Sequence, residues 1–235
     1  APHTPWLPNA GVEGQSQAGT YGDFVRLVDQ MVGSILGTLD EMNMADETLI
    51  IVTSDNGAHW TPEDKALYSH RANHVYRGQK ADIYEAGHRV PYIARWPKRI
   101  PQGSQSRQVM CSTDLLATVS GIVDRPLPSG AGEDSVNMFP AHIDTESMEP
   151  LRDFTIHHSL NGYFSIRKGQ WKLTPHLGSG GFSIPTDNDP NEEGTKGTLY
   201  DLEVDPKETI NLYVDRPEVV LELESLLETV TKQDI

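Results

Sequence analysis

The sequence predicts an α/β fold in two parts, and two patterns carry this prediction. Up to about residue 140, apolar residues at helical spacing alternate with short apolar runs, as in one half of a doubly wound sheet. After the stretch 126–132, which is rich in proline and glycine, short strand-like runs separated by turn signals predict a small α+β subdomain. We therefore expect two domains, 1–140 and 141–235.

The first part begins with an amphipathic helix over about 22–42. Its apolar residues recur every three or four positions and form one stripe, which we expect to lie on a sheet. The stripe consists of Val25, Val28, Val32, Ile35, Leu39 and Met42. Asn43 is a suitable residue to end this helix, and a strand over 48–53 follows a short acidic turn.

The strand over 48–53 contains the continuous apolar run 49–52, which predicts burial on both faces of a parallel sheet. Another short strand is predicted over 91–95. The apolar pattern of 113–123 predicts a helix that begins near Ser112 or Thr113.

The second part is predicted to be an antiparallel meander closed by a helix. Strands over 154–158, 163–167 and 171–174 are separated by Asn161-Gly162 and by 168–170, which are strong turn signals. A fourth strand is expected at 198–201 and an amphipathic helix over 217–231.

Composition and charge exclude several classes of protein. The 235 residues, 37% of them hydrophobic, can bury a sizeable core, and no apolar stretch approaches the roughly 18 residues of a membrane span. The single Cys111 excludes an internal disulfide. The chain opens without a signal-like segment, so we expect either that such a segment is removed or that the chain begins inside a longer protein.

The net charge of −15 is unevenly distributed. The stretch from Arg71 to Arg99 contains seven lysines and arginines but only two acidic residues, and such a basic stretch suits an anionic substrate. Three of the seven, Arg95, Lys98 and Arg99, are expected in a solvated turn. The stretch 186–235 holds fourteen acidic and four basic residues, which argues against nucleic acid as a partner.

A candidate metal loop follows the strand over 48–53. Asp55 and Asn56 stand where the strand ends, on a turn closed by Gly57, and ligands bind beyond the carboxyl ends of such strands. Their oxygens are hard ligands of the kind that Ca²⁺ and Mg²⁺ prefer. The alternative is an Asx-turn that only ends the strand.

Five segments in order, 48–57, 77–91, 114–118, 199–202 and 205–212, resemble the second half of a type I sulfatase, a family of the alkaline-phosphatase-like superfamily. The resemblance runs from 2–5 to the final helix. It implies a sulfuric ester hydrolase of the arylsulfatase kind, acting on a sulfated small molecule or glycan, with Ca²⁺ favoured over Mg²⁺. It also implies an exported protein, periplasmic or extracellular.

The resemblance also assigns site residues. His3, between two prolines, matches a histidine that contacts the sulfate, and Lys80 matches the lysine that binds the sulfate and the leaving oxygen. Asp55 and Asn56 match metal ligands. Arg77 is expected to support the loop, outside the catalytic set.

Two further pairs are predicted. Glu85 and Arg89 are expected to pair and hold their turn. The stretch 70–74, which begins with His70 and ends with His74, resembles one near the substrate entrance of some sulfatases that act on carbohydrates. We therefore predict that these two histidines contact the substrate. A helical zinc pair is the alternative for these two histidines, but no acidic third ligand is near in sequence.

The formylglycine motif of these sulfatases, Cys-x-Pro-x-Arg or Ser-x-Pro-x-Arg, does not occur, and Cys111 matches neither form. The first metal-binding aspartate pair is absent as well. We expect the chain to be inactive alone, because a covalent mechanism needs its nucleophile, and to associate with an N-terminal half or with itself. The alternatives are a phosphodiesterase or phosphonate hydrolase of the same superfamily and a non-catalytic module with the same fold.

Overall fold

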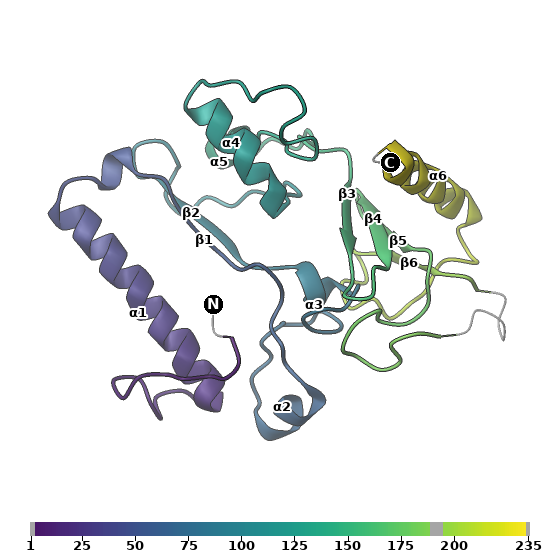
Figure 1. The fold of residues 1–235 in the computed structure, drawn as a ribbon, viewed down its shortest axis with the longest axis horizontal. Helices are drawn as coiled ribbons and strands as arrows, with labels where there is room; N and C mark the ends of the chain where they lie inside the picture. The colour runs from purple at the N-terminus through teal and green to yellow at the C-terminus, as the bar shows by residue number, and fades with distance from the viewer. Residues whose placement is uncertain (1–2, 189–194, 234–235) are drawn as a thin grey trace. The chain divides into compact units, whose positions relative to one another are not determined.

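The computed structural model describes residues 3–188 and 195–233 and separates into two compact units. Unit 1 comprises residues 1–54, 59–74 and 91–102, and unit 2 comprises 55–58, 75–90 and 103–235. Figure 1 labels the elements in chain order. No helix of the described residues is long and apolar enough to cross a membrane.

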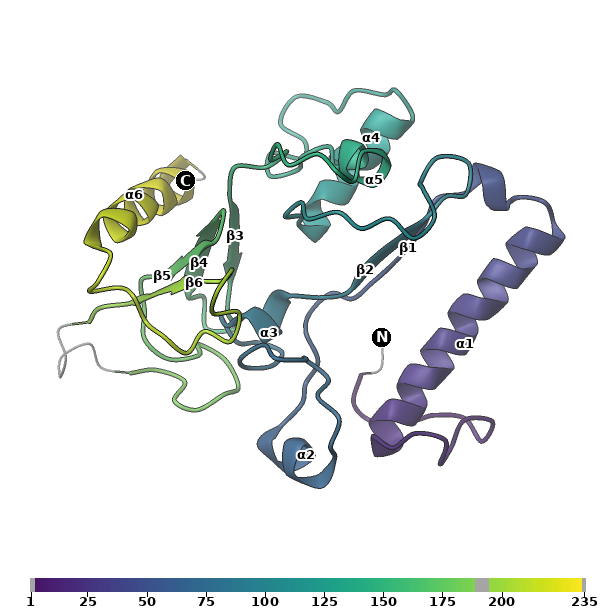
Figure 2. The ribbon, with the colours of Figure 1, turned by 180° about the vertical axis from the view of Figure 1, so that it is seen from behind.

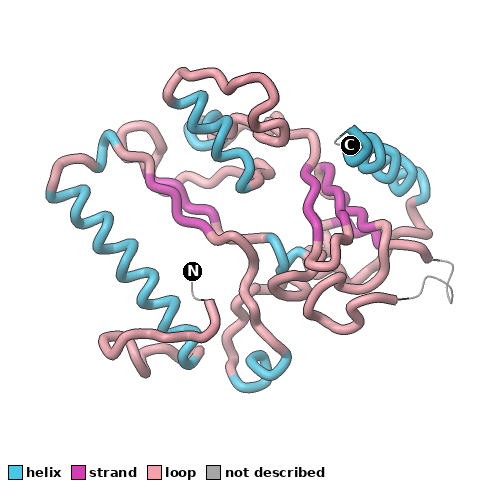
Figure 3. The backbone as a smooth tube through the Cα atoms, in the orientation of Figure 1, coloured by secondary structure: helices cyan, strands magenta, loops and turns pink. Residues whose placement is uncertain are grey.

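Unit 1 contains three helices and two strands: α1 (Gly19–Glu41), η1 (Ala45–Glu47), β1 (Ile50–Thr53), α2 (Pro62–Leu67) and β2 (Tyr92–Arg95). The predicted strands over 48–53 and 91–95 are both present. They pair with each other in antiparallel register, Ile50 opposite Arg95 and Thr53 opposite Tyr92. Figure 3 shows that most of the chain between them is loop.

The expectation that β1 lies in a parallel sheet, buried on both faces, was wrong for this chain. The β1 residues 50–52 are half-buried and Thr53 is exposed. A four-residue apolar run indicates that a strand prefers burial, but it contains no information on the direction of the neighbouring strand.

Helix α1 ends as predicted at Asn43. This residue adopts a left-handed conformation with φ 55°, and its N–H donates to the carbonyl of Asp40 over 3.1 Å. The N–H of Met44 donates to the carbonyl of Leu39 over 2.8 Å. The two bonds form a Schellman motif, which satisfies carbonyls that the end of a helix leaves unpaired.

The apolar stripe of α1 is not buried in the way that the sequence predicts. Val25 is 40% exposed, Ile35 55% and Met42 62%. The lengths explain the difference, because a helix of 23 residues is about 35 Å long, whereas a strand of four residues spans about 13 Å. The two short strands of unit 1 are too small to cover this stripe.

Unit 2 contains the remaining elements: α3 (Glu85–His88), η2 (Ser112–Asp114), α4 (Leu115–Ile122), α5 (Phe139–Ile143), β3 (Thr155–His158), β4 (Phe164–Lys168), β5 (Trp171–Thr174), β6 (Thr198–Asp201) and α6 (Pro217–Gln233). The strands form one antiparallel sheet in the order β3-β4-β5-β6. The predicted meander, fourth strand and closing helix are therefore confirmed.

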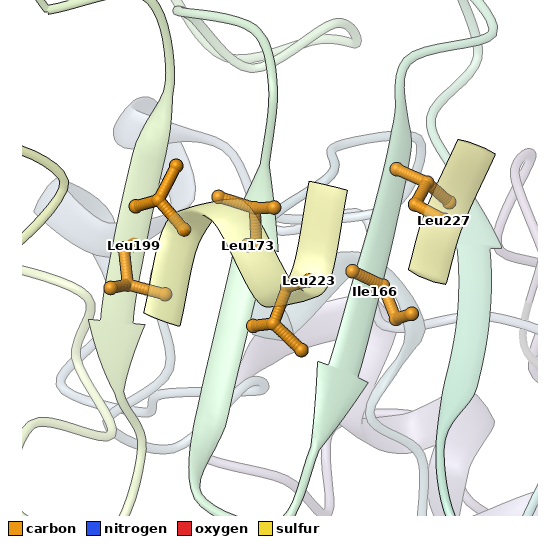
Figure 4. Packing of buried hydrophobic residues seen from close by; sticks show 6 residues of the cluster. Ile166, Leu173, Leu199, Leu223 and Leu227 are labelled. Carbon is orange, nitrogen blue, oxygen red and sulfur yellow. The ribbon is translucent and has the colours of Figure 1, made fainter. Parts of the chain in front are cut away.

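Helix α6 packs on the sheet and forms the core of this unit, as both views of the ribbon show (Figures 1 and 2). Leu223 and Leu227 lie over three strand residues, Ile166, Leu173 and Leu199, and all five are at most 5% exposed (Figure 4). Each strand residue comes from a different strand, so the helix ties β4, β5 and β6 together.

The helix predicted over 113–123, with its start near Ser112 or Thr113, begins as η2 at Ser112, and the N-cap residue is Cys111. The N–H of Cys111 donates to the Asp114 carboxylate over 2.7 Å, while the cysteine side chain accepts from the Asp114 N–H. The carboxylate three residues after the cap completes this capping box, so it selects the start of the helix.

Candidate functional site

The candidate metal loop, 55–58, belongs to unit 2 although it directly follows β1. Asp55 is exposed and Asn56 is half-buried. The Asn56 Nδ2 donates to the carbonyl of Gly57 over 3.0 Å. This bond assigns the nitrogen to the loop itself, so Oδ1 is the atom through which Asn56 would contact a cation.

Gly57 is required at its position because two backbone segments approach each other there. Its N–H donates to the carbonyl of Gly87 over 3.0 Å. A Cβ at residue 57 would lie 1.6 Å from the carbonyl oxygen of Ala86. Only glycine permits this approach, which joins the metal loop to α3.

Lys80 lies in the same unit, and its backbone is bonded to the metal loop. The Lys80 N–H donates to the carbonyl of Ala58 over 3.1 Å. Its ammonium group, on a half-buried residue, forms no salt bridge or side-chain hydrogen bond with the residues the structure describes. The structure thus brings together three of the predicted residues, Asp55, Asn56 and Lys80, on segments joined by backbone hydrogen bonds.

Other basic residues of the 71–99 stretch form hydrogen bonds or salt bridges within the structure. Arg77 Nη1 donates to Tyr200 Oη over 3.2 Å and to the carbonyl of Glu208 over 3.0 Å, and its guanidinium lies 3.9 Å from the Tyr84 ring centre. These contacts fit the supporting role expected for Arg77. Arg95 and Lys98 form salt bridges with acidic residues of unit 1.

The remaining predicted residues, His3, His70 and His74, belong to unit 1. His3 is exposed, and its Nδ1 lies 2.7 Å from the carbonyl oxygen of Thr4. The exposed His70 ring lies 5.6 Å from the buried Trp60 ring and 6.4 Å from the Tyr21 ring.

The helical zinc alternative for His70 and His74 is wrong. Helix α2 ends at Leu67, and His74 has a positive φ of 53°, which a helix does not allow. No group of three or more histidine, cysteine or acidic side chains suited to a metal occurs in the part of the chain that the structure describes. The chemistry of Asp55 and Asn56, a carboxylate beside a carboxamide oxygen, fits part of a Ca²⁺ site, since that cation takes six to eight oxygen ligands.

Unit 2 contains a buried charged cluster that the sequence did not predict. Lys172 is 1% exposed, and its Nζ lies 2.8 Å from Glu208 Oε1 and 3.2 Å from Glu85 Oε1. The Nζ also donates to the carbonyl of Ile83 over 2.8 Å. The only indication of this cluster in the sequence was a lysine between Trp171 and Leu173 in a predicted strand. The alternation of side chains along a strand places such a lysine on the solvent face, so the sequence did not indicate that it is buried.

The predicted pair of Glu85 and Arg89 is confirmed at 2.9 Å and belongs to this cluster. Burial alone raises the pKa of Glu85, but Lys172 and Arg89 outweigh burial and bring that pKa to about 2. Burial also raises the pKa of Glu208, and here Lys172 opposes it without reversing the shift. The two pKa values shift in opposite directions because Arg89, a second cation, pairs with Glu85, whereas Glu208 pairs with Lys172.

Two histidines of the cluster remain neutral at physiological pH. The rings of His88 and His157 lie 3.5 Å apart. Burial, with the charge of Lys172, lowers the pKa of His157 to about 3. Burial, His157 and Lys172 hold the pKa of His88 well below its usual range. The cluster therefore holds α3, and with it the metal loop, against β3 and β5.

Comparison with known proteins identifies the family of this chain. The family model described as Sulfatase matches residues 1–124. N-acetylgalactosamine-6-O-sulfatase of Bacteroides thetaiotaomicron is 34% identical over an alignment of 243 positions that covers 97% of this chain and 45% of the relative. Steryl-sulfatase of Homo sapiens is 30% identical over an alignment of 224 positions that covers 88% of this chain and 38% of the relative.

A solved structure from work on the metabolism of multiple glycosaminoglycans by Bacteroides thetaiotaomicron has the same fold. It matches with a TM-score of 0.83 and 32% identity, covering 98% of this chain and 48% of that chain. The chain spans about half the length of the relatives it matches. On the family model, the ordered motifs and the common fold, the chain belongs to the sulfatase family.

Proposed function

We propose that this chain supplies the lysine-bearing part of a sulfatase active site, and that the assembled enzyme hydrolyses a sulfate ester. One observation carries the proposal. The Lys80 ammonium has no partner among the described residues, while its backbone is bonded to the loop that holds Asp55 and Asn56. A cation placed in this way can bind the sulfate and stabilise charge on the leaving oxygen as the S–O bond breaks.

The loop residues Asp55 and Asn56 would hold Ca²⁺, with further ligands from outside this chain. Ca²⁺ is favoured over Mg²⁺ because an exposed, glycine-closed loop suits the more flexible coordination of the larger ion. When bound, the ion supplies positive charge to the sulfate oxygens. His3 is exposed on unit 1 and lies between two prolines, and it would donate a proton to an anionic oxygen of the substrate.

The nucleophile is proposed to come from a segment that this chain lacks. Burial raises the pKa of Cys111, and the residue serves as the N-cap of η2. A thiol that favours its protonated form is a poor nucleophile, so Cys111 does not replace a formylglycine. This chain alone should then hydrolyse no sulfate ester. The exposed stripe of α1 supports association with an N-terminal half.

A sulfated carbohydrate is the proposed substrate. The exposed His70 lies 6.4 Å from the half-buried Tyr21 ring in unit 1, and an aromatic ring next to a polar side chain suits a sugar, which has apolar faces and hydroxyl edges. The similarity to an N-acetylgalactosamine-6-O-sulfatase supports the same class. The similarity to a steryl-sulfatase makes a sulfated steroid or aryl alcohol the second candidate.

Lys80→Ala in the complete polypeptide tests the proposal. Turnover of 4-nitrophenyl sulfate should fall by about 10²- to 10³-fold, because removing one group aimed at developing charge has that effect. Lys65→Ala is the matched control, since Lys65 is an exposed lysine on α2 and its loss should leave turnover unchanged. Unaltered turnover in Lys80→Ala, or a wild-type preference for a phosphodiester over the sulfate ester, would contradict the proposal.

Calcium binding is tested separately by calorimetry on this chain. We expect weak binding that Asp55→Ala abolishes, because affinity rises with the number and charge of the ligands. Tight, saturable binding that persists in Asp55→Ala would overturn the metal assignment.

A further inference from the structure

Lys80 stands at the corner of a strained turn. The N–H of Asp82 donates to the carbonyl of Gln79 over 3.1 Å, which closes a four-residue turn with Lys80 and Ala81 at its centre. Ala81 has a φ of 79°, the positive value that type II turns require at their third position and that glycine normally supplies. An alanine in this conformation persists only when the surrounding structure imposes it.

The backbone around the turn is bonded on both sides. Lys80 N–H donates to the carbonyl of Ala58, and the carbonyl of Ala81 accepts from the N–H of Leu160 over 2.9 Å. The N–H of Ile83 donates to the carbonyl of Ser179 over 2.8 Å. A Cβ at Gly181 would lie 2.3 Å from the carbonyl oxygen of Ala81, so loop 178–185 packs directly on the turn.

The Asp82 carboxylate connects the turn to that loop. Asp82 is 2% exposed. Its Oδ2 accepts from the N–H of Gln79 over 2.9 Å and from the hydroxyl of Ser183. Its Oδ1 accepts from the N–H of Ser183 over 2.9 Å. One buried carboxylate thus closes the turn internally and fastens it to loop 178–185.

The charge of Asp82 is compensated by these hydrogen bonds and not by Lys80. Asp82 forms no salt bridge with any residue in the described ranges, although Lys80 is only two positions away. A carboxylate that paired with Lys80 would neutralise the cation that the sulfate needs. Here the carboxylate orients the backbone of the turn and leaves the ammonium charge for an anionic ligand.

We propose that Asp82 is a positioning residue for Lys80, supported by Ser183. The inference rests on the proposed function, because Lys80 must act on the sulfate ester for its position to affect turnover. Displacing a reacting group by about 1 Å can reduce turnover about 100-fold. Loss of the Asp82 carboxylate should therefore reduce kcat and not only stability.

Asp82→Asn in the complete polypeptide is the test. Asparagine keeps the shape of the side chain but replaces one carboxylate oxygen by an NH2 group, which cannot accept a hydrogen bond, so one of the two backbone N–H groups loses its acceptor. We expect kcat on 4-nitrophenyl sulfate to fall about 10- to 100-fold with a smaller change in KM. The matched control is Asp205→Asn. Asp205 is a buried carboxylate of the same unit that also accepts two backbone N–H bonds and a hydroxyl, from Thr209 and Ile210.

Two further readouts separate positioning from a general structural effect. Lys80→Ala should affect esters with poor leaving groups more than 4-nitrophenyl sulfate, and Asp82→Asn should show the same steeper dependence. Adding Asp82→Asn to Lys80→Ala should cause no further loss, because two residues that act through one group are not additive. Asp205→Asn should keep the wild-type kcat and leaving-group dependence.

The inference fails if Asp82→Asn keeps the wild-type kcat, loses no more than Asp205→Asn, or adds fully to Lys80→Ala. Full activity of Lys80→Ala would instead contradict the proposed function, so the two failures are distinct. If Asp82→Asn does not fold, Ser183→Ala decides, since it removes one hydroxyl donor and retains the carboxylate. A reduced kcat in Ser183→Ala supports the inference, and an unchanged kcat overturns it.

Discussion

Lys172→Met is the substitution that most directly tests how the buried charged cluster holds unit 2 together. Methionine keeps the unbranched stem but removes the ammonium group between Glu85 and Glu208, whose side chains are both 1% exposed. Arg89 still compensates Glu85 after the substitution, whereas Glu208 loses its only salt-bridge partner in the described part of the chain.

The expected loss of stability follows from that imbalance. Removing one partner of a buried ion pair costs roughly 3–5 kcal/mol, because a charge remains in the interior without compensation. For a chain of this size, each kcal/mol lowers Tm by about 2–4 °C, so Tm should fall by roughly 6–20 °C. Glu208→Gln added to Lys172→Met should recover part of the loss, since it removes the uncompensated charge.

Urea unfolding at pH 7, followed by circular dichroism, measures these differences. Lys168→Met is the matched control, because Lys168 is on the neighbouring strand β4 and forms an exposed salt bridge with Glu222. Its removal should leave stability nearly unchanged. Equal unfolding curves for Lys172→Met and Lys168→Met, or no recovery in the double variant, would refute the reasoning.

Two further predictions concern the same unit. Gly57→Ala should destabilise the protein by about 1–3 kcal/mol and weaken Ca²⁺ binding, because its Cβ would meet the Ala86 carbonyl at 1.6 Å; Gly33→Ala, with open space around it in α1, is the calorimetric control. Stability should also fall as pH decreases from 6.5 toward 3, because folded His157, with its pKa of about 3, binds fewer protons there than the unfolded chain. Glu85 adds to the fall below pH 4.5 and Glu208, with its raised pKa, opposes it. His157→Phe should flatten the pH 5–7 part of the curve, and an unchanged slope would contradict the assignment.

The sequence by itself determined those elements whose periodicity is long or whose ends are chemically marked. Helix α1 stops at Asn43 because a short polar side chain tolerates the left-handed conformation. The meander of unit 2 was predictable because Asn161-Gly162 and the 168–170 turn separate its strands. Asp55, Asn56 and Lys80 were predicted as site residues from residue types and motif order, and that role stays a prediction.

Only the tertiary structure decided which surfaces and groups meet. The antiparallel pairing of β1 with β2 joins segments about forty residues apart, and a four-residue apolar run does not encode such a partner. The burial of Lys172 depends on Glu85 and Glu208, which lie far from it in sequence, because a buried charge is stable only where partners converge in space. Asp82 likewise connects the Lys80 turn to Ser183, about one hundred residues away. Periodicity and composition are local, whereas desolvation and hydrogen-bond satisfaction are settled by the whole fold.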